Sequence, residues 1–348
     1  MIGEGELTLP FILEKINEKL ELPEIVKEAA KEGLGAATIY NNTIYISKNK
    51  KNVNLDEIKA LPINRGIVGP IEIMRGCPWG CKYCQVSYMF GFSPRFRSPE
   101  NICYWIKQVI RLKHSLNKHA DIRFVAPDSF SYGRDPRNKK EYFDIFELFE
   151  KLIKIKKEYS RTRIFFGTFP SEVRPDSVSK EIVKEIKKFV DNKSLIMGVQ
   201  TASNKLLKHI NRGHTLEDAI NAIEIINNEG FLVELDFIFG LPGETKEDRE
   251  ITLNVIENII KKYKVRIHLH TFMPLPGTPF DSEPPGKLDH EIKKRIYKLI
   301  GKGLVYGQWE KQEIVAKKID ELRKSRTIIT TKTLKEMLDK GEIKIKIY

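Results

Sequence analysis

Residues 75–91 read Arg-Gly-Cys-Pro-Trp-Gly-Cys-Lys-Tyr-Cys-Gln-Val-Ser-Tyr-Met-Phe-Gly, and three of the four cysteines of the chain fall within eight positions of this stretch. Cys77, Cys81 and Cys84 are separated by three and then two residues. A loop, rather than a helix or a strand, must therefore wrap the three thiolates around one inorganic centre, and the glycines in the stretch supply the permissive backbone for it. We call residues 76–85 the cysteine loop and expect the rest of the fold to be organised around it.

The number of cysteines suits an iron–sulfur cluster better than zinc. Clusters are normally held by four thiolates, so three without a fourth Cys or His nearby suit a [4Fe-4S] cluster with one iron left free. Structural zinc takes four closed ligands, usually as two pairs, and the second pair is missing. Cys103 lies in an apolar run that predicts a buried helix face, where a lone Cys is usually a small hydrophobe. A disulfide is disfavoured by the tight spacing and by the lack of a secretion signal.

The Cys-x3-Cys-x2-Cys spacing, with Tyr83 directly before the last Cys, resembles the signature of the radical S-adenosylmethionine (SAM) superfamily. The resemblance implies that Cys77, Cys81 and Cys84 hold three irons, that SAM chelates the fourth, and that Tyr83 lies against the adenine. It implies reductive cleavage of SAM to methionine and a 5′-deoxyadenosyl radical, which abstracts a hydrogen atom from a substrate that the sequence does not identify. An electron donor such as ferredoxin or flavodoxin is expected as a partner.

From Ile71 onward, short apolar strands alternate with helices, which predicts repeated βα units and a parallel sheet. Six such units with right-handed crossovers make a partial TIM-like (βα)6 barrel, whose chemistry lies at the carboxyl ends of the strands. This is the α/β core that the resemblance implies, over residues 71–280. The expected strands are 71–74, 121–126, 163–167, 195–200, 231–239 and 265–272, and the expected helices are 99–117, 140–159, 177–190, 204–209, 216–229 and 246–261.

The second and third strand ends carry candidate ligands. Asp128 follows the second strand, where the superfamily has a Gly-Gly-Glu-type turn that meets the methionine amino group of SAM; a turn-forming Asp is the alternative. Glu172 and Arg174 follow the third strand. They are candidates for holding the substrate or the SAM carboxylate, because a guanidinium binds a carboxylate in a bidentate fork, or they form a structural ion pair.

The fourth strand end, residues 198–203, and the segment 211–215 resemble the region that contacts the SAM ribose in cobalamin-type members and in methylthiotransferases. The resemblance implies hydrogen bonds from Gln200 and Ser203 to the ribose hydroxyls and an ion pair between Arg212 and the methionine carboxylate. Arg212 as a capping or surface residue is the alternative. His214 is expected to be a turn residue.

The fifth strand resembles the Gly-x-Ile-x-Gly-x-x-Glu motif of the superfamily, which implies that Ile238 packs near the adenine and that Gly240 permits its close approach. Asp236 replaces the first glycine and is either a satisfied core carboxylate or a substrate contact. On the sixth strand, His268 and His270 share one face. They could bind a metal or shuttle a proton, although a pair without a third ligand is more often structural.

Residues 1–70 form a separate segment with expected helices at 10–20 and 23–31, a hairpin at 37–46 turning at Asn41-Asn42, and a polar connector at 48–51. The initial Gly3-Glu-Gly-Glu6 resembles the linker that follows the cobalamin-binding domain of cobalamin-type radical SAM proteins. Only two residues precede Gly3, so that domain has been lost, comes from another chain, or lies upstream of a misplaced start. Cobalamin is thus a candidate cofactor that this segment alone is not expected to hold.

Residues 281–348 leave the barrel through a Pro/Gly-rich linker and form a basic, helical C-terminal extension, with helices expected at 289–300, 308–324 and 332–339. Methylthiotransferases need a second cluster and end in an RNA-binding β-domain. This extension lacks cysteines and its pattern is helical, which weighs against that subfamily.

The net charge of +13 permits RNA binding without indicating it, because the lysines are spread along the chain and alternate with glutamates on helical faces. No stretch approaches 18 uninterrupted apolar residues and the N-terminus does not resemble a signal peptide, so we expect no membrane span and a cytoplasmic, reducing location.

Three hypotheses follow from the sequence. The first is a radical SAM enzyme similar to the cobalamin-type methyltransferases, which modifies an unactivated carbon. The second is a methylthiotransferase-like RNA modifier. The third is a non-enzymatic RNA-binding protein with a structural cluster.

Overall fold

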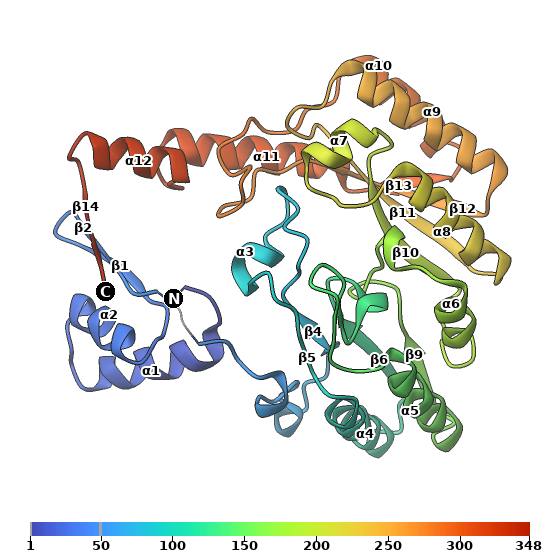
Figure 1. Cartoon of the computed structure of the whole chain (residues 1–348), viewed down its shortest axis with the longest axis horizontal. Coiled ribbons are helices and arrows are strands. Elements are labelled where there is room, and N and C mark those ends of the chain that lie inside the picture. The colour runs from blue at the N-terminus through green and yellow to red at the C-terminus, as the bar shows by residue number, and fades with distance from the viewer. Residues whose placement is uncertain (1, 49–50) are drawn as a thin grey trace.

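All six predicted barrel strands are present, and a short seventh strand joins them. In this computed structural model, which describes residues 2–48 and 51–348, they form two parallel sheets joined by one parallel bridge between Val173 and Met197. The first sheet has the order β3-β6-β9 and the second the order β10-β11-β12-β13 (Figure 1). The bounds are β3 Ile71–Glu72, β6 Ala120–Val125, β9 Thr162–Phe165, β10 Ser194–Gln200, β11 Leu232–Phe239, β12 Val265–Thr271 and β13 Val305–Gly307.

The crossover helices pack amphipathic faces on the sheets, and all but one share a core with the strands; the exception, Asn204–His209, packs in a separate small cluster. They are α4 Pro99–Ser115, α5 Ile145–Glu158, α6 Lys180–Ile186, α7 Asn204–His209, α8 Leu216–Asn228 and α9 Lys246–Lys262. Two predicted helix starts are wrong. Asp144 caps α5 by accepting from the backbone N–H of Phe146 (2.9 Å), and Ser179 caps α6 by accepting from that of Ile182 (3.3 Å), so both helices begin later than periodicity indicates. The residues before α5 instead form the hairpin of β7 (Arg134–Asp135) and β8 (Lys140–Glu141).

The first predicted strand is interrupted at Ile73. Its second half, β4 (Met74–Arg75), leaves the parallel sheet and pairs antiparallel with β5 (Arg95–Phe96). The cysteine loop and the short helix α3 (Val86–Phe90) lie between these two strands. The loop is therefore held at both ends by one two-stranded ladder.

The N-terminal segment is a small α/β unit with its own core of buried residues on α2 and at the start of the hairpin. It contains α1 (Gly5–Asn17), α2 (Leu22–Lys31), β1 (Ala37–Tyr40) and β2 (Thr43–Ile46). The predicted turn is confirmed, since Asn41 and Asn42 have φ of 46° and 54°. The helix α1 begins five residues before the predicted Pro10. Asn49 and Lys50 of the predicted connector lie outside the described residues.

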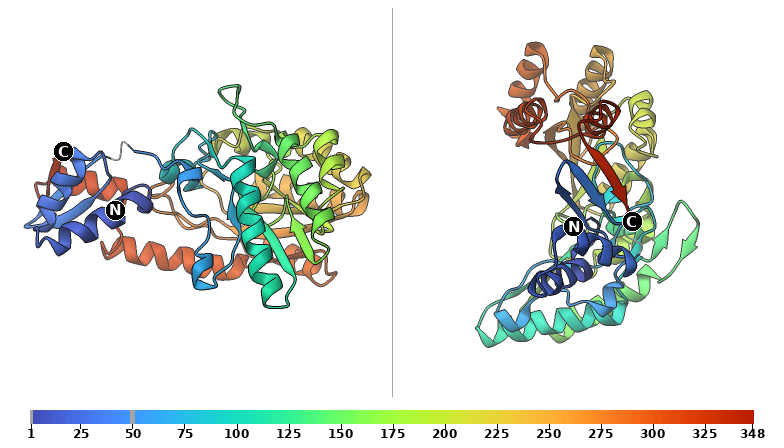
Figure 2. Two further views of the ribbon diagram at one scale, coloured as in Figure 1. Left: turned by 90° about the horizontal axis from the view of Figure 1, so that it is seen from below. Right: turned by 90° about the vertical axis from the view of Figure 1, so that its left-hand side faces the viewer.

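The C-terminal extension has the three predicted helices, α10 (His290–Ile300), α11 (Trp309–Lys324) and α12 (Thr331–Asp339). It also has two strands that we did not predict. The strand β13 extends the barrel sheet beside β12, and β14 (Lys344–Ile347) pairs parallel with β2. The extension therefore runs from the barrel back to the N-terminal unit, and the C-terminal strand lies beside the hairpin of that unit (Figures 1 and 2). In the described part of the chain, no helix has both the length and the apolar character to cross a membrane.

Candidate active site

The three cysteines of the loop line one cavity of about 270 Å³ at the carboxyl ends of the barrel strands. Cys81 is buried, and Cys77 and Cys84 are partly buried. The loop is folded around Ser87, whose hydroxyl donates to the carbonyl of Cys77 (2.7 Å) and accepts from the N–H of Gly80 (3.1 Å). These bonds turn the chain sharply enough for three side chains to point into the same space. We call it the cluster cavity.

The cluster cavity suits a cationic inorganic centre. Burial raises the pKa of the Cys77 thiol to about 11 and also raises the pKa of Cys84. Thiols in such a place stay protonated unless a metal centre binds them as thiolates. Three sulfur donors on one cavity wall fit a [4Fe-4S] cluster that leaves one iron for another ligand. Cys103 lies on α4, is partly buried and packs against the barrel core, and it does not line this cavity.

Two buried arginines also line the cluster cavity. Arg212 donates to the carbonyl of Gly198 (2.6 Å), and its Nη1 lies 3.7 Å from Sγ of Cys81. Arg174 stacks on the indole of Trp79 (4.1 Å to the ring centre) and pairs with Asp176 at 3.0 Å. Nε of Arg212 and Nη1 of Arg174 are buried without a hydrogen-bond partner. These two atoms are free to donate to an anionic ligand such as a carboxylate.

A second cavity of about 300 Å³ adjoins the first, and we call it the distal cavity. Tyr83, Phe169, Glu172 and Gln200 line both cavities, so they form the boundary between them. Gln200 has a φ of 75° at a register shift of β10, which turns its side chain out of the sheet pattern and toward this boundary. The geometry thus offers one space beside the cysteines and another one beyond it.

Glu172 is the acidic group at this boundary. Burial, together with the negative charge of Asp236, raises the pKa of its carboxyl to about 7. A carboxyl in this state would be stabilised in its ionised form by a cationic ligand in either cavity.

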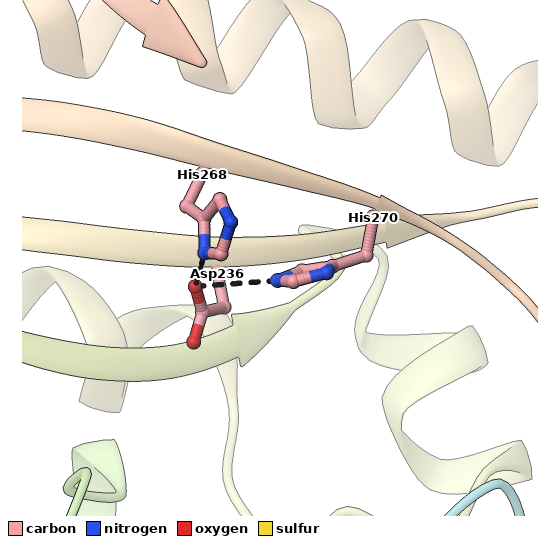
Figure 3. A group of neighbouring side chains, drawn as sticks. All are labelled: Asp236, His268 and His270. Carbon is pink, nitrogen blue, oxygen red and sulfur yellow. Dashed lines mark hydrogen bonds and ion pairs between the residues drawn. The ribbon is translucent and has the colours of Figure 1, made fainter. Parts of the chain in front are cut away.

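The distal cavity holds a group of titratable side chains from two neighbouring strands. Asp236 of β11 and His268 of β12 are register partners, and His270 follows two residues later on the same face. Nδ1 of His268 lies 2.8 Å from Oδ1 of Asp236, and Nε2 of His270 lies 3.5 Å from the same oxygen (Figure 3). The sequence showed two histidines without a third ligand, and the structure adds Asp236 to them.

Ile238 also lines the distal cavity and packs in the same cluster as Tyr83. Among the described residues, three other residues that were predicted to lie against SAM line neither cavity: Asp128, Ser203 and Gly240. Asp128 accepts hydrogen bonds from the hydroxyls of Ser131 (2.5 Å) and Ser177 (2.8 Å), so it fits the turn alternative. Ser203 caps α7 and donates to Asp248 (2.6 Å).

Gly240 also has a packing role. A Cβ at this position would lie 2.7 Å from Cα of Gly286, so the glycine makes room for another part of the backbone. Thr245 caps α9 by accepting from the backbone N–H of Asp248. His214 is buried and bonded to the carbonyl of Thr215 (3.1 Å), and burial lowers its pKa to about 3. Its neutral ring fits the predicted turn position.

The sequence did not reveal two side chains that reach the cavities. Phe169 lies in the segment after β9 and is 68% exposed. Gln312 comes from α11 of the C-terminal extension, and its amide contacts Nδ1 of His270 (3.1 Å) and the N–H of Thr271 (2.9 Å). No sequence motif marks either residue, because each is brought to the cavities by the tertiary fold and not by its position next to a recognisable motif.

The Gly3-Glu-Gly-Glu6 segment acts on the site from outside the barrel. Glu4 is buried and pairs with Arg95, and its Oε2 also accepts from the N–H of Val53 (2.8 Å). Glu6 pairs with Arg75 at 2.7 Å. Because Arg75 and Arg95 lie on β4 and β5, the two glutamates clamp the ladder that flanks the cysteine loop. We call these contacts the N-terminal clamp.

The comparisons with known proteins agree with this geometry. A family model described as the radical SAM superfamily matches residues 71–256. A tRNA-2-methylthio-N(6)-dimethylallyladenosine synthase of Natranaerobius thermophilus is 29% identical over 284 residues, which is 80% of this chain and 56% of that protein. The chain spans about half the length of the curated relatives it matches.

Solved structures show the same fold. The cobalamin-dependent SAM radical enzyme OxsB, with aqua-cobalamin and SAM bound, aligns with a TM-score of 0.56 and 16% identity, over 98% of this chain and 54% of that one. The radical SAM methyltransferase TsrM of Kitasatospora setae aligns with a TM-score of 0.53 and 14% identity, over 80% of this chain and 52% of that one.

Proposed function

Because the chain belongs to the radical SAM superfamily, we propose that the cluster cavity binds the [4Fe-4S] cluster and SAM, and that the distal cavity binds the substrate. The observation that carries this proposal is the pair of adjoining cavities. One is lined by Cys77, Cys81 and Cys84, and the other is separated from it only by four shared side chains. When bound, the reduced cluster supplies the electron that cleaves SAM to methionine and a 5′-deoxyadenosyl radical.

Each lining group has a separate task in this proposal. The three thiolates hold the cluster, and the free donors of Arg212 and Arg174 bind the methionine carboxylate. Glu172, ionised, attracts the positive groups of SAM. Tyr83 and Ile238 give the adenine an apolar surface. Gln200 is positioned to bond the ribose, because it lines both cavities.

We further propose that the radical serves a methyl transfer or a related modification of a carbon in the substrate. The support is the Gly3-Glu-Gly-Glu6 segment, which resembles the linker of cobalamin-type members and clamps β4 and β5 here. The N-terminal unit would then be the place where a cobalamin-binding domain, from this protein or from another chain, meets the barrel.

A methylthiotransferase-like RNA modification is the second candidate. The tRNA-2-methylthio-N(6)-dimethylallyladenosine synthase of Natranaerobius thermophilus favours it, since that relative is 29% identical over 80% of this chain. Against it, these 348 residues carry only one cysteine outside the loop, so they cannot supply a second set of three. A cytoplasmic location and a ferredoxin- or flavodoxin-type electron donor remain part of the proposal, supported by the oxygen sensitivity expected of the cluster.

The test is an anaerobic assay of SAM cleavage. The protein is reconstituted with iron and sulfide, and 5′-deoxyadenosine is measured after adding SAM and dithionite. We expect the wild type and the Cys103→Ala variant to form it, and the Cys84→Ala variant to form none. Wild-type protein with four irons per chain and no 5′-deoxyadenosine would contradict the proposal and favour a structural cluster.

A further inference from the structure

Asp236, His268 and His270 form a convergent donor set that the proposed radical chemistry does not use. They come from the two central strands of the second sheet, and their donor atoms all lie within 4.8 Å of one another. Asp236 is 5% exposed, whereas the two imidazoles are about a quarter exposed, on the side of the distal cavity. All three side chains line the distal cavity, and the two imidazoles converge on the carboxylate (Figure 3).

The two spacings between the carboxylate oxygen and the imidazole nitrogens are close to those of metal ligands. First-row divalent ions bond to imidazole nitrogen and carboxylate oxygen at about 2.0–2.2 Å, so neighbouring ligands of one ion lie about 3 Å apart. The two nitrogen–oxygen distances here, 2.8 and 3.5 Å, lie on either side of this value. As a hydrogen bond, the longer distance is outside the normal range. An ion between the three atoms would bond to both Nδ1 of His268 and Nε2 of His270, whereas Asp236 makes a hydrogen bond of normal length with only the first of these two nitrogens.

The surroundings fix both rings. The His268 ring stacks on Tyr306, with ring centres 4.6 Å apart and an angle of 10° between the planes. The Tyr306 hydroxyl is in turn bonded to Glu234. His270 is held by the amide of Gln312. Metal sites in proteins need such outer contacts to orient their ligands.

Gln312 sets the strength of the site. Its Oε1 accepts from the N–H of Thr271, so its Nε2 faces Nδ1 of His270. In the metal-free protein this contact places the imidazole proton on Nε2, and an ion must displace that proton. When the ion binds Nε2 of His270, the imidazole proton moves to Nδ1, where it faces the N–H donor of the Gln312 amide. A carboxylate at position 312 would instead accept from both Thr271 and His270.

We propose that Asp236, His268 and His270 bind one divalent ion from the iron-to-zinc part of the first transition series. Two imidazoles and one carboxylate leave coordination positions open, and here these positions face the distal cavity. The ion would therefore bind an oxygen or nitrogen donor group of the molecule in that cavity. This proposal does not depend on SAM cleavage.

Zinc alone serves as the probe. The full chain, with its cluster reconstituted to four irons, is treated with a chelator, desalted without oxygen and dialysed against Zn²⁺. Bound zinc and iron are counted by mass spectrometry, and X-ray absorption at the zinc edge identifies the ligands, since Zn–S bonds are about 2.3 Å and Zn–N or Zn–O bonds about 2.0–2.2 Å. We expect one zinc per chain with only nitrogen and oxygen ligands.

The variants Asp236→Asn, His268→Gln and His270→Gln should each weaken zinc binding by about 100-fold or more, since even outer contacts of metal sites contribute about 10- to 100-fold. His290→Gln, at an exposed histidine of α10, is the matched control and should bind as the wild type does. Gln312→Glu should raise the affinity about tenfold. Iron content and circular dichroism report whether each variant folds.

If Asp236→Asn fails to fold, His270→Gln decides the question, because its ring lies in the open cavity and is held by one amide. The proposal is overturned if the wild type binds no zinc, if the bound zinc has sulfur ligands, or if folded His270→Gln retains the wild-type affinity.

Discussion

Glu4→Gln is the substitution that best separates the N-terminal clamp from ordinary surface charge. The Glu4 side chain is 3% exposed, pairs with Arg95, and lies 3.4 Å from Nη1 of Arg75. Breaking a buried ion pair by removing one charge costs about 3–5 kcal/mol. Arg95 keeps two backbone acceptors, the carbonyls of Val53 (2.8 Å) and Phe90 (3.0 Å), so we expect a loss near the lower end, about 3 kcal/mol.

The matched control is Glu6→Gln in the same segment. The Glu6 side chain is 35% exposed, and its partner Arg75 retains Glu72 at 2.6 Å. We expect a loss of about 0–1 kcal/mol. For a chain of this length, 3 kcal/mol corresponds to a fall in melting temperature of about 4 °C, measured by circular dichroism.

The functional consequence is faster loss of the cluster, because β4 and β5 must separate for the cysteine loop to open. If the clamp contacts are absent once the loop is open, Glu4→Gln lowers the free energy of opening by the same 3 kcal/mol. The variant should therefore release iron to a chelator about 100-fold faster than the wild type. Absorbance of the cluster follows this release. Equal release rates in the Glu4→Gln and Glu6→Gln variants would refute the clamp.

Two other predictions concern the cavities and the loop. The pKa of Glu172 is raised to about 7, so its carboxyl ionises as the pH rises through that value. SAM affinity, measured by equilibrium dialysis, should therefore rise up to about tenfold between one pH unit below that pKa and one unit above it. A Glu172→Gln variant with the same pH dependence would contradict this. Gly76→Ala, whose Cβ would lie 3.0 Å from the carbonyl oxygens of Gly91 and Ser93, should lower iron content after reconstitution; Gly66→Ala shares the positive φ but has no atom within 4 Å, so equal iron loss in both would contradict the steric reason.

The sequence was sufficient for the features that depend on local pattern. The spacing of the three cysteines, the alternation of strands and helices, and the Asn41-Asn42 turn are each set by residues close together in the chain. The N-cap residues Asp144 and Ser179 mark the starts of α5 and α6 in the sequence. The prediction followed hydrophobic periodicity instead and placed both starts too early. The alternating Lys344-Ile-Lys-Ile347 was likewise a readable, though short, strand signal.

The remaining features depend on contacts between distant segments. Asp128 and Ser203 follow strands, as SAM ligands would. However, Asp128 accepts a hydrogen bond from the Ser177 hydroxyl, and Ser203 donates one to the Asp248 carboxylate, and neither partner could be foreseen from the sequence. Gln312 reaches the distal cavity because β13 joins the barrel sheet and places α11 beside β12. The grouping of Asp236 with His268 required the register between β11 and β12, which no single strand reveals.

The most direct test of the account is Mössbauer spectroscopy of the protein reconstituted with ⁵⁷Fe. The account predicts four irons per chain, three of which keep their parameters on addition of SAM while one changes, because Cys77, Cys81 and Cys84 leave a single iron for SAM. Four irons that all remain unchanged with SAM would contradict the central claim that the cysteine loop leaves one iron open for SAM.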